Sequence, residues 1–217
     1  MPTTCVCGAA ITVDHAMTSP SGGYPTAQHI EVRDVVADAM CSVFADVETE
    51  PKLLSYTEED LLGKMTNRAK EARVDIRANG FWTRQQEAFF GIRIMHPKAN
   101  LSTLDDVKKQ LTAHEREKKR SHAERINVID CGVFTPLVFT TNGMIGHECS
   151  TCLKSLVASI VEKNVDLSYS QVMHHLRCKL SFCLLRWGIT CLRGCRASFR
   201  RSHWSDFLNE CRLVSGM

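Results

Sequence analysis

An acid and a cation in residues 72–95, ARVDIRANGFWTRQQEAFFGIRIM, stand where two neighbouring strands can bring them together. The stretch predicts two β-strands joined by a Gly-Phe-Trp turn, with Asp75 on the first strand and Arg93 on the second. Because strand side chains alternate between faces, these two can meet at one end of a small sheet. An acid beside a cation is the beginning of a metal-dependent phosphodiesterase site. An ion pair that only stabilises a half-exposed sheet is an equally simple interpretation.

A second group of residues near the N-terminus has the chemistry of a zinc site. A Cys-Val-Cys-Gly turn can present two thiolates to one metal, and a histidine follows eight residues after the second cysteine. Tetrahedral zinc needs four ligands, but Ser19 occupies the position at which another cysteine would complete the set. A later histidine is the candidate substitute. The expected zinc ligands are Cys5, Cys7, His15 and His29. The alternative is an unstructured segment with two free thiols.

The chain has eleven cysteines, and its first twenty residues lack the basic start and apolar run of a signal peptide. We therefore expect an intracellular protein, nuclear or cytoplasmic, whose cysteines are thiols or metal ligands. A second possible metal group is His147, Cys149 and Cys152, although no further pair follows at a convincing spacing. Free thiols are the simpler interpretation of these residues.

The distribution of charge suits a partner with a phosphate backbone. The net charge is only +3, but residues 172–217 contain eight Arg or Lys and two acids, and residues 108–125 form a second basic tract. Such patches favour nucleic acid, although a solvated helix face explains them equally well. From the basic tracts we expect DNA, or an RNA/DNA hybrid, as the partner. No apolar run is long enough to cross a membrane, so we expect no membrane partner.

The spacing of apolar residues predicts an α/β fold with a central mixed sheet of about four strands. The helix over 27–46 has a buried valine stripe, and Glu31 lies near its start. The expected order is a helix over 27–46, a short strand within 47–56, a loop over 57–71, two strands within 72–95, a helix from 102 or 103 to 126, a strand over 133–141, and helices over 148–163 and from 168 or 170 to 192.

This order of helix, three strands, helix and strand is that of the restriction-endonuclease-like core, the PD-(D/E)xK fold. We expect a knuckle-like module over 1–29, the core over 30–145, a helical extension over 146–195, and a basic, loosely ordered tail over 196–217.

The chain also resembles the C-terminal portion of retroelement polyproteins, in which a Cys/His knuckle precedes a restriction-like endonuclease downstream of a reverse transcriptase. The resemblance rests on CVCGAAITVDHAMTSPSGGYPTAQHIEVRD, then ARVDI, GFW, AFFGIRI, HEREKKR and FTPLVFTTNG in this order, and it covers nearly the whole chain from Cys5 to about Arg196.

The resemblance implies a set of site residues. Asp75 would bind Mg²⁺ or Mn²⁺ as the acid of the PD half-motif, with Glu31 as the helix acid that assists the metal. Arg93 would take the basic position of the second half-motif. From the following helix, His114, Glu115 and Lys118 would flank the scissile phosphate. The side chains expected to contact phosphate or DNA are Arg73, His114, Lys119 and Arg120.

Two departures from the family pattern bear on activity. Gly91 stands two residues before Arg93, where the family has an acid, and Ser19 removes a knuckle ligand. Two carboxylates normally share the Mg²⁺ that activates water. The first hypothesis is therefore a retroelement-derived, Mg²⁺-dependent DNA endonuclease domain that is either active or silenced. The alternatives are a catalytically dead nucleic-acid-binding module and a zinc-supported interaction domain.

Overall fold

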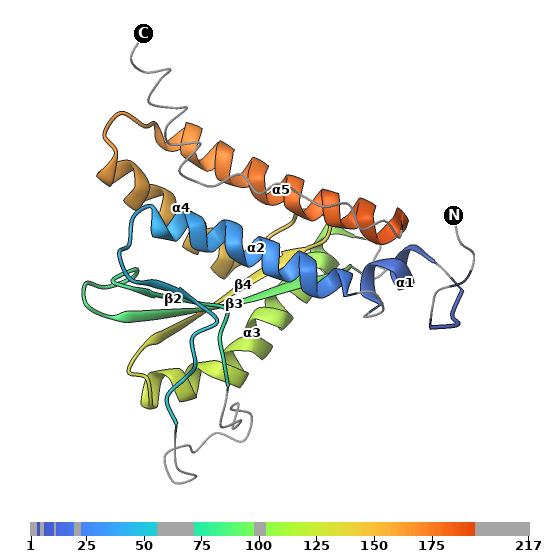
Figure 1. Ribbon diagram of the computed structural model, residues 1–217, viewed down its shortest axis with the longest axis horizontal. Coiled ribbons are helices and arrows are strands. Elements are labelled where there is room, and N and C mark those ends of the chain that lie inside the picture. Colours follow the sequence, from blue (N-terminus) through green and yellow to red (C-terminus); the bar gives the residue numbers. More distant parts are fainter. Residues whose placement is uncertain are drawn as a thin grey trace.

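The computed structural model describes residues 4, 7–10, 12–19, 23–55, 72–97 and 103–193. Within this part the fold is mixed α/β, with a four-stranded sheet and five helices. The elements are α1 (Val13–Thr18), α2 (Tyr24–Cys41), β1 (Val47–Thr49), β2 (Ile76–Asn79), β3 (Glu87–Met95), α3 (Leu104–Val128), β4 (Val133–Thr140), α4 (His147–Lys163) and α5 (Tyr169–Arg193) (Figure 1).

The sheet has the strand order β1-β2-β3-β4, with antiparallel pairing up to β3 and parallel pairing between β3 and β4. Parallel neighbours require a crossover connection, and α3 supplies it. β4 is the last strand, and its Pro136 lies opposite Gly91 of β3. An edge strand tolerates a proline because no further strand needs the missing N–H. In the described part of the chain β4 is accordingly an edge strand of the sheet.

β2 covers only half of β3. Their pairing runs from Asn79 opposite Glu87 to Ile76 opposite Phe90. In the described part of the chain, the remaining half of β3 therefore pairs with β4 alone. This divergence leaves a backbone edge inside the fold, next to the N-terminal half of α2.

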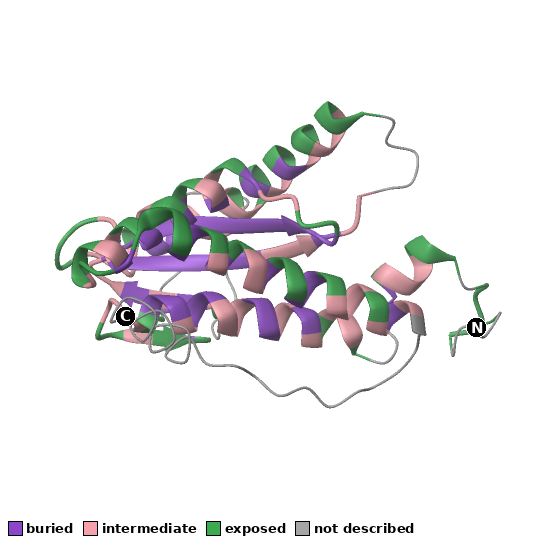
Figure 2. Cartoon of the chain, turned by 90° about the horizontal axis from the view of Figure 1, so that it is seen from above, coloured by how far each residue is buried: buried purple, intermediate pink, exposed green. Residues whose placement is uncertain are grey.

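The helices cover the two faces of the sheet unequally. In Figure 1, α2, α4 and α5 lie above the strands and α3 lies below them. The upper face holds the main core, in which Ile76, Phe90 and Ile92 pack against side chains of these three helices. The lower face holds two smaller clusters, around Phe89 with Phe134 and around Met95 with Val138. Figure 2 shows the resulting pattern, with strands largely buried and helices buried along one side.

α3 begins and ends as its sequence predicts. The hydroxyl of Thr103 accepts a hydrogen bond from the Asp106 N–H at 3.2 Å, and Asp105 and Asp106 lie in the first turn. Both features stabilise a helix N-terminus. Few α3 side chains are buried, because its outer face is highly charged; two of the buried ones are Glu115 and Arg125. Glu115 accepts a hydrogen bond from the Glu148 N–H at the start of α4 (2.9 Å), and Arg125 donates to the Leu54 carbonyl (3.0 Å).

Some expectations need correction. The short strand expected within 47–56 is present as β1 but extends only to Thr49, and the N-terminal module contains the short helix α1, which begins after the capping residue Thr12. The tail over 196–217 and the whole of the loop over 57–71 lie outside the described residues. None of the described helices combines the length and the apolar character needed to cross a bilayer.

Candidate functional site

Asp75 lies where β2 leaves β3, and its side chain extends the hydrogen bonding of the sheet. Its backbone N–H donates to the Phe90 carbonyl at 3.1 Å, and its own carbonyl accepts from the Glu50 N–H at 3.0 Å. One step further along β3, the Oδ2 of Asp75 accepts from the Ile92 N–H at 2.5 Å. The carboxylate thus occupies the place that a strand backbone would take, at the start of the free half of β3.

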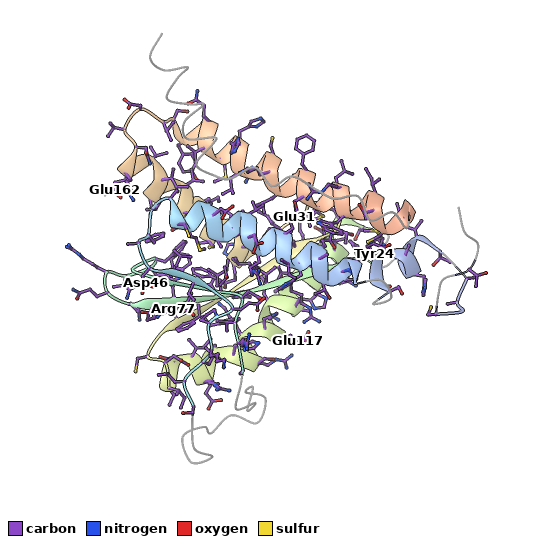
Figure 3. All side chains as sticks on the ribbon, in the orientation of Figure 1. Tyr24, Glu31, Asp46, Arg77, Glu117 and Glu162 are labelled. Carbon is purple, nitrogen blue, oxygen red and sulfur yellow. The ribbon has the colours of Figure 1, made fainter. Side chains whose placement is uncertain are left out.

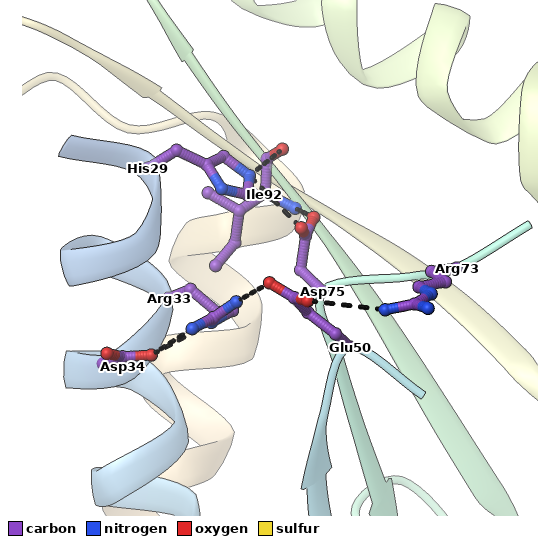
Figure 4. Close-up of polar contacts among 7 residues, drawn as sticks. All are labelled: His29, Arg33, Asp34, Glu50, Arg73, Asp75 and Ile92. Atoms are coloured by element: carbon purple, nitrogen blue, oxygen red, sulfur yellow. Dashed lines mark hydrogen bonds and ion pairs between the residues drawn. The ribbon is translucent and has the colours of Figure 1, made fainter. Parts of the chain in front are cut away.

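His29 of α2 approaches the same point from the upper layer. Its Nε2 lies 3.2 Å from the Oδ1 of Asp75 and 3.3 Å from the Ile92 carbonyl (Figure 4). A carboxylate and a carbonyl can only accept, so Nε2 carries the hydrogen. Both oxygens of Asp75 are therefore engaged, one by the imidazole and one by the backbone.

The pKa of Asp75 is lowered by these contacts. Burial acts to raise the pKa, but it is outweighed by the hydrogen bond and charge of His29, the charge of Lys118 and the Ile92 N–H. Asp75 is accordingly a carboxylate at neutral pH. It is a half-buried anion held between two layers of the fold.

Lys118 reaches this anion from α3 on the lower side of the sheet. Burial lowers the pKa of its ammonium, and the charge of Arg93 lowers it further, while Asp75 and Glu117 act in the opposite direction. The Cδ of Lys118 lies 3.7 Å from the position that a Cβ on Gly91 would occupy. The lysine stem therefore passes over Gly91.

The space beside Gly91 is filled from a second direction. A Cβ at this position would lie 2.7 Å and 2.9 Å from two ring atoms of Phe134, closer than carbon atoms can pack. The buried Phe134 ring lies next to His122, with ring centroids 5.2 Å apart. Burial and then the charge of Lys118 lower the pKa of His122 to about 4. An acid at residue 91 would thus require Phe134 to move, which the sequence alone did not indicate.

Arg93 does not pair with Asp75. Its guanidinium binds Glu117 of α3 at 2.7 Å, and the same carboxylate oxygen lies 3.5 Å from the Nδ1 of His114. Burial lowers the pKa of His114, as does the charge of Arg93, whereas Glu117 partly opposes them. The expected Asp75–Arg93 contact is therefore wrong, because the two side chains leave the sheet toward different neighbours.

A cavity of about 550 Å³ lies along the free half of β3. None of its described lining residues is an acid. The polar part of the wall combines two cations and three histidines: His29, Arg93, His96, His114 and Lys118. His96 is fixed by Thr141, at 2.7 Å from its Nδ1, and by Asp14, at 3.0 Å from its Nε2. Arg93 and Lys118 therefore bring positive charge to this wall, and their acidic neighbours Glu117 and Asp75 are not among its described lining residues.

Glu31 faces away from this cavity. Its carboxylate binds the guanidinium of Arg186 and the indole N–H of Trp187, both on α5. Figure 3 shows Glu31 on the α5 side of α2, whereas Glu117 extends from α3 on the other side of the sheet. Residues two apart on a helix do not share a face, so His29 and Glu31 cannot both face Asp75. The expected metal-assisting position of Glu31 is wrong.

The remaining residues expected to contact DNA lie outside the cavity wall. Arg73 is exposed and lies 3.8 Å from Glu50, as Figure 4 shows. Lys119 pairs with Glu148 of α4 at 2.7 Å, and Arg120 is exposed on α3. Of the expected phosphate ligands, the structure brings only His114 to the cavity, together with Lys118 and Arg93 from the expected catalytic set.

The metal sites expected from the sequence are incomplete in the described residues. Cys7 and His15 do come together, with 3.4 Å between Sγ and Nε2, but Cys5 lies outside the described residues and His29 is engaged by Asp75. Nowhere in the described ranges do three or more Cys, His, Asp or Glu gather as a metal group. A magnesium ion would find one carboxylate here, with both oxygens already bound, so the side chains near Asp75 do not fit it.

Cys149 and Cys152 are fully buried, and burial raises the pKa of both thiols far above neutrality. Both side chains belong to the main hydrophobic core, where they pack among apolar neighbours.

No protein-family model matches the chain, and no curated protein does either.

Proposed function

We propose that this chain is a nucleic-acid-binding domain of restriction-endonuclease-like architecture, which holds a phosphate of the backbone in the cavity beside Asp75 and does not hydrolyse it. The single observation that carries the proposal is the composition of the cavity wall: Arg93, Lys118 and three histidines, with no acid among the described lining residues.

The arrangement of elements supports the architectural part of the proposal. A helix precedes three antiparallel strands, and a crossover helix leads to a fourth strand parallel to the third. This is the α-β-β-β-α-β order expected for the restriction-endonuclease-like core. Asp75 lies where the second and third strands diverge, and its pKa is lowered. The retroelement origin rests on the sequence resemblance alone.

Two physical effects favour phosphate in this cavity: its charged hydrogen-bond donors and its partial burial. Arg and Lys form charge-assisted hydrogen bonds with phosphate, and such bonds strengthen in a half-buried site. The pKa of Lys118 is lowered by burial and by Arg93, so an anion in the cavity would relieve an unfavourable charge environment. The exposed Arg120 and Lys109 of α3 add positive charge on the adjoining helix.

Hydrolysis is disfavoured by two features of the same site. The second carboxylate of the family pattern is missing, and its space holds the Phe134 ring and the Lys118 stem. Each oxygen of the remaining carboxylate, Asp75, is already engaged, one by His29 and the other by the Ile92 N–H. The site can therefore bind a phosphodiester without assembling the metal that would activate water.

A binding assay with matched variants tests the proposal. Fluorescence anisotropy with a labelled DNA duplex would compare the chain with Lys118→Gln and with Lys154→Gln, a control on the exposed side of α4. We expect Lys118→Gln to weaken binding about tenfold, since charged hydrogen bonds contribute about 1.5–3 kcal/mol, and Lys154→Gln to change it little. Equal effects of the two variants, with both proteins folded, would remove the cavity from the account.

Plasmid nicking in Mg²⁺ and in Mn²⁺ separates binding from cleavage. The proposal predicts DNA binding without nicking. Nicking that disappears in Asp75→Asn would contradict it and would assign this chain to the metal-dependent endonucleases.

A further inference from the structure

A row of large apolar side chains lies on the solvent side of α5. Phe182, Leu185 and Ile189 are 69%, 57% and 41% exposed. Their spacing of three and four residues places them along one stripe of the helix, opposite the face formed by Leu176, Leu180 and Leu184 in the core. Single exposed apolar residues are ordinary, but a continuous row on one helix indicates a surface that another segment covers.

The stripe borders a cavity of about 510 Å³ between α2 and α5. Its α5 wall includes Phe182 together with Cys178 and Cys183, and its α2 wall includes Val35 and Asp38. Phe182 belongs to both the stripe and the cavity wall, and the wall also carries charged side chains, among them Glu31 and Arg186. We call the cavity and the stripe together the α2–α5 groove.

The chain itself carries a segment suited to this groove. Residues 194–217 follow α5 directly and lie outside the described residues. In their sequence, Trp204, Phe207, Leu208 and Cys211 recur at the i, i+3, i+4, i+7 spacing of one helix face. This is the pattern with which amphipathic segments fill apolar grooves.

The residues that join α5 to this segment are numerous enough to let it reach the groove. Phe182 lies eleven residues before Arg193 on α5, a distance of about 17 Å along a helix. The ten residues 194–203 span up to about 33 Å when extended, so Trp204 can reach the groove. A tethered segment has an effective concentration on the order of millimolar, which favours it over a second copy at micromolar protein.

We propose that residues 204–214 pack into the α2–α5 groove of their own chain, with Trp204, Phe207 and Leu208 covering Phe182, Leu185 and Ile189. The groove is thereby an intramolecular docking surface on the opposite side of the sheet from α3. It is independent of the phosphate-binding cavity.

Limited trypsin digestion of the full chain tests this docking. The reporter site is Arg212, which lies inside the proposed docked segment, and Arg200 and Arg201 in the preceding linker serve as the internal reference. Phe182→Glu places a charge in the groove at an exposed position, so it leaves the fold intact. Val165→Glu is the matched control, because Val165 is 88% exposed and lies between α4 and α5, outside the groove.

We expect Phe182→Glu to raise the initial cleavage rate at Arg212, relative to Arg200 and Arg201, about tenfold, since cleavage follows the population of the undocked state, and Val165→Glu to leave it unchanged. Trp204→Ala should act like Phe182→Glu. Equal cleavage of the unaltered chain and Phe182→Glu would overturn the proposal. Protection that rises from low to high micromolar protein would also overturn it, because a second copy would then be the occupant.

Discussion

At Asp75, one carboxylate serves both the sheet and the cavity. It replaces a missing strand at the Ile92 N–H, and it sets the charge that His29 and Lys118 meet from opposite layers. A carboxylate with two engaged oxygens is a positioning group for its neighbours. Its charge also acts on the Lys118 ammonium, whose stem passes over Gly91 of β3.

Replacing Asp75 should therefore cost stability in a pH-dependent way. The pKa of Asp75 is lower in the folded chain than in the unfolded chain, so its contribution is full at neutral pH and is lost as the pH falls below about 4. We expect Asp75→Ala to lower the free energy of unfolding by about 1.5–3 kcal/mol at pH 7 and by less at pH 3, measured by urea denaturation. The exposed Asp105→Ala serves as control, with a small change at both values of pH. An equal loss at both values for Asp75→Ala would contradict the lowered pKa.

A second prediction at the residue scale concerns Gly91. Gly91→Asp should destabilise the chain by about 1–3 kcal/mol through overpacking against Phe134, and it should not create Mg²⁺ binding. The double variant Gly91→Asp with Phe134→Ala replaces the ring by a methyl group and so removes the clash. The double-mutant cycle should then give a favourable coupling of about 1 kcal/mol or more. Additive effects in chemical denaturation would show that the ring does not limit residue 91.

Residue positions were partly predictable from the sequence. The alternation of β3 placed Gly91 and Arg93 on one face, and Lys118 did arrive near Asp75. The errors concern direction: Arg93 pairs with Glu117, and Glu31 points to α5 while His29 takes its place. Helical spacing shows which residues of α2 share a face, but it does not show which other element that face contacts. The sequence alone therefore could not tell whether His29 or Glu31 faces Asp75. His122 and Phe134 carried no motif that would have signalled them.

At the scale of elements, α3 organises the site because its side chains reach both the cavity and the start of α4. It supplies Lys118 and His114 to the cavity and Glu115 to the start of α4. Its bounds and those of β4 followed from capping and β-branched residues. The late start of β2 at Ile76, which leaves the second half of β3 without β2 as a neighbour, did not, since short strands are defined by pairing partners rather than by local sequence.

The α3–α4 junction gives a prediction with an internal control of opposite sign. A Cβ on Gly146 would overlap the Oε1 of Glu115, so Gly146→Ala must displace the carboxylate that accepts from the Glu148 N–H. We expect a loss of about 1–3 kcal/mol in the free energy of unfolding.

Gly188→Ala is the control for that junction, because its Cβ would meet Met17 at an ordinary 3.5 Å within helix α5. It should stabilise the chain by up to about 1 kcal/mol through helix propensity. Destabilisation by both substitutions to the same extent would indicate a general intolerance of alanine rather than the Glu115 contact.

At the scale of the molecule, the cavity beside Asp75 and the α2–α5 groove are separate places that share only helix α2. The cavity opens between α2, β3 and α3, whereas the α2–α5 groove lies in the outer helical layer. The α/β class and the mixed sheet were predictable from the order of elements. The sequence did not predict that α2 borders both the cavity and the α2–α5 groove, because this depends on how three helices pack over four strands.

The salt dependence of DNA binding tests the central claim most directly. The logarithm of the binding constant falls with the logarithm of salt concentration by about 0.9 for each neutralised phosphate contact in duplex DNA. We predict that the double variant Arg93→Gln with Lys118→Gln reduces this slope by about 1 to 2, while the control Lys154→Gln leaves it unchanged. A slope that is the same for the unaltered chain and the double variant, with both proteins folded, would show that the cavity beside Asp75 does not contact the backbone.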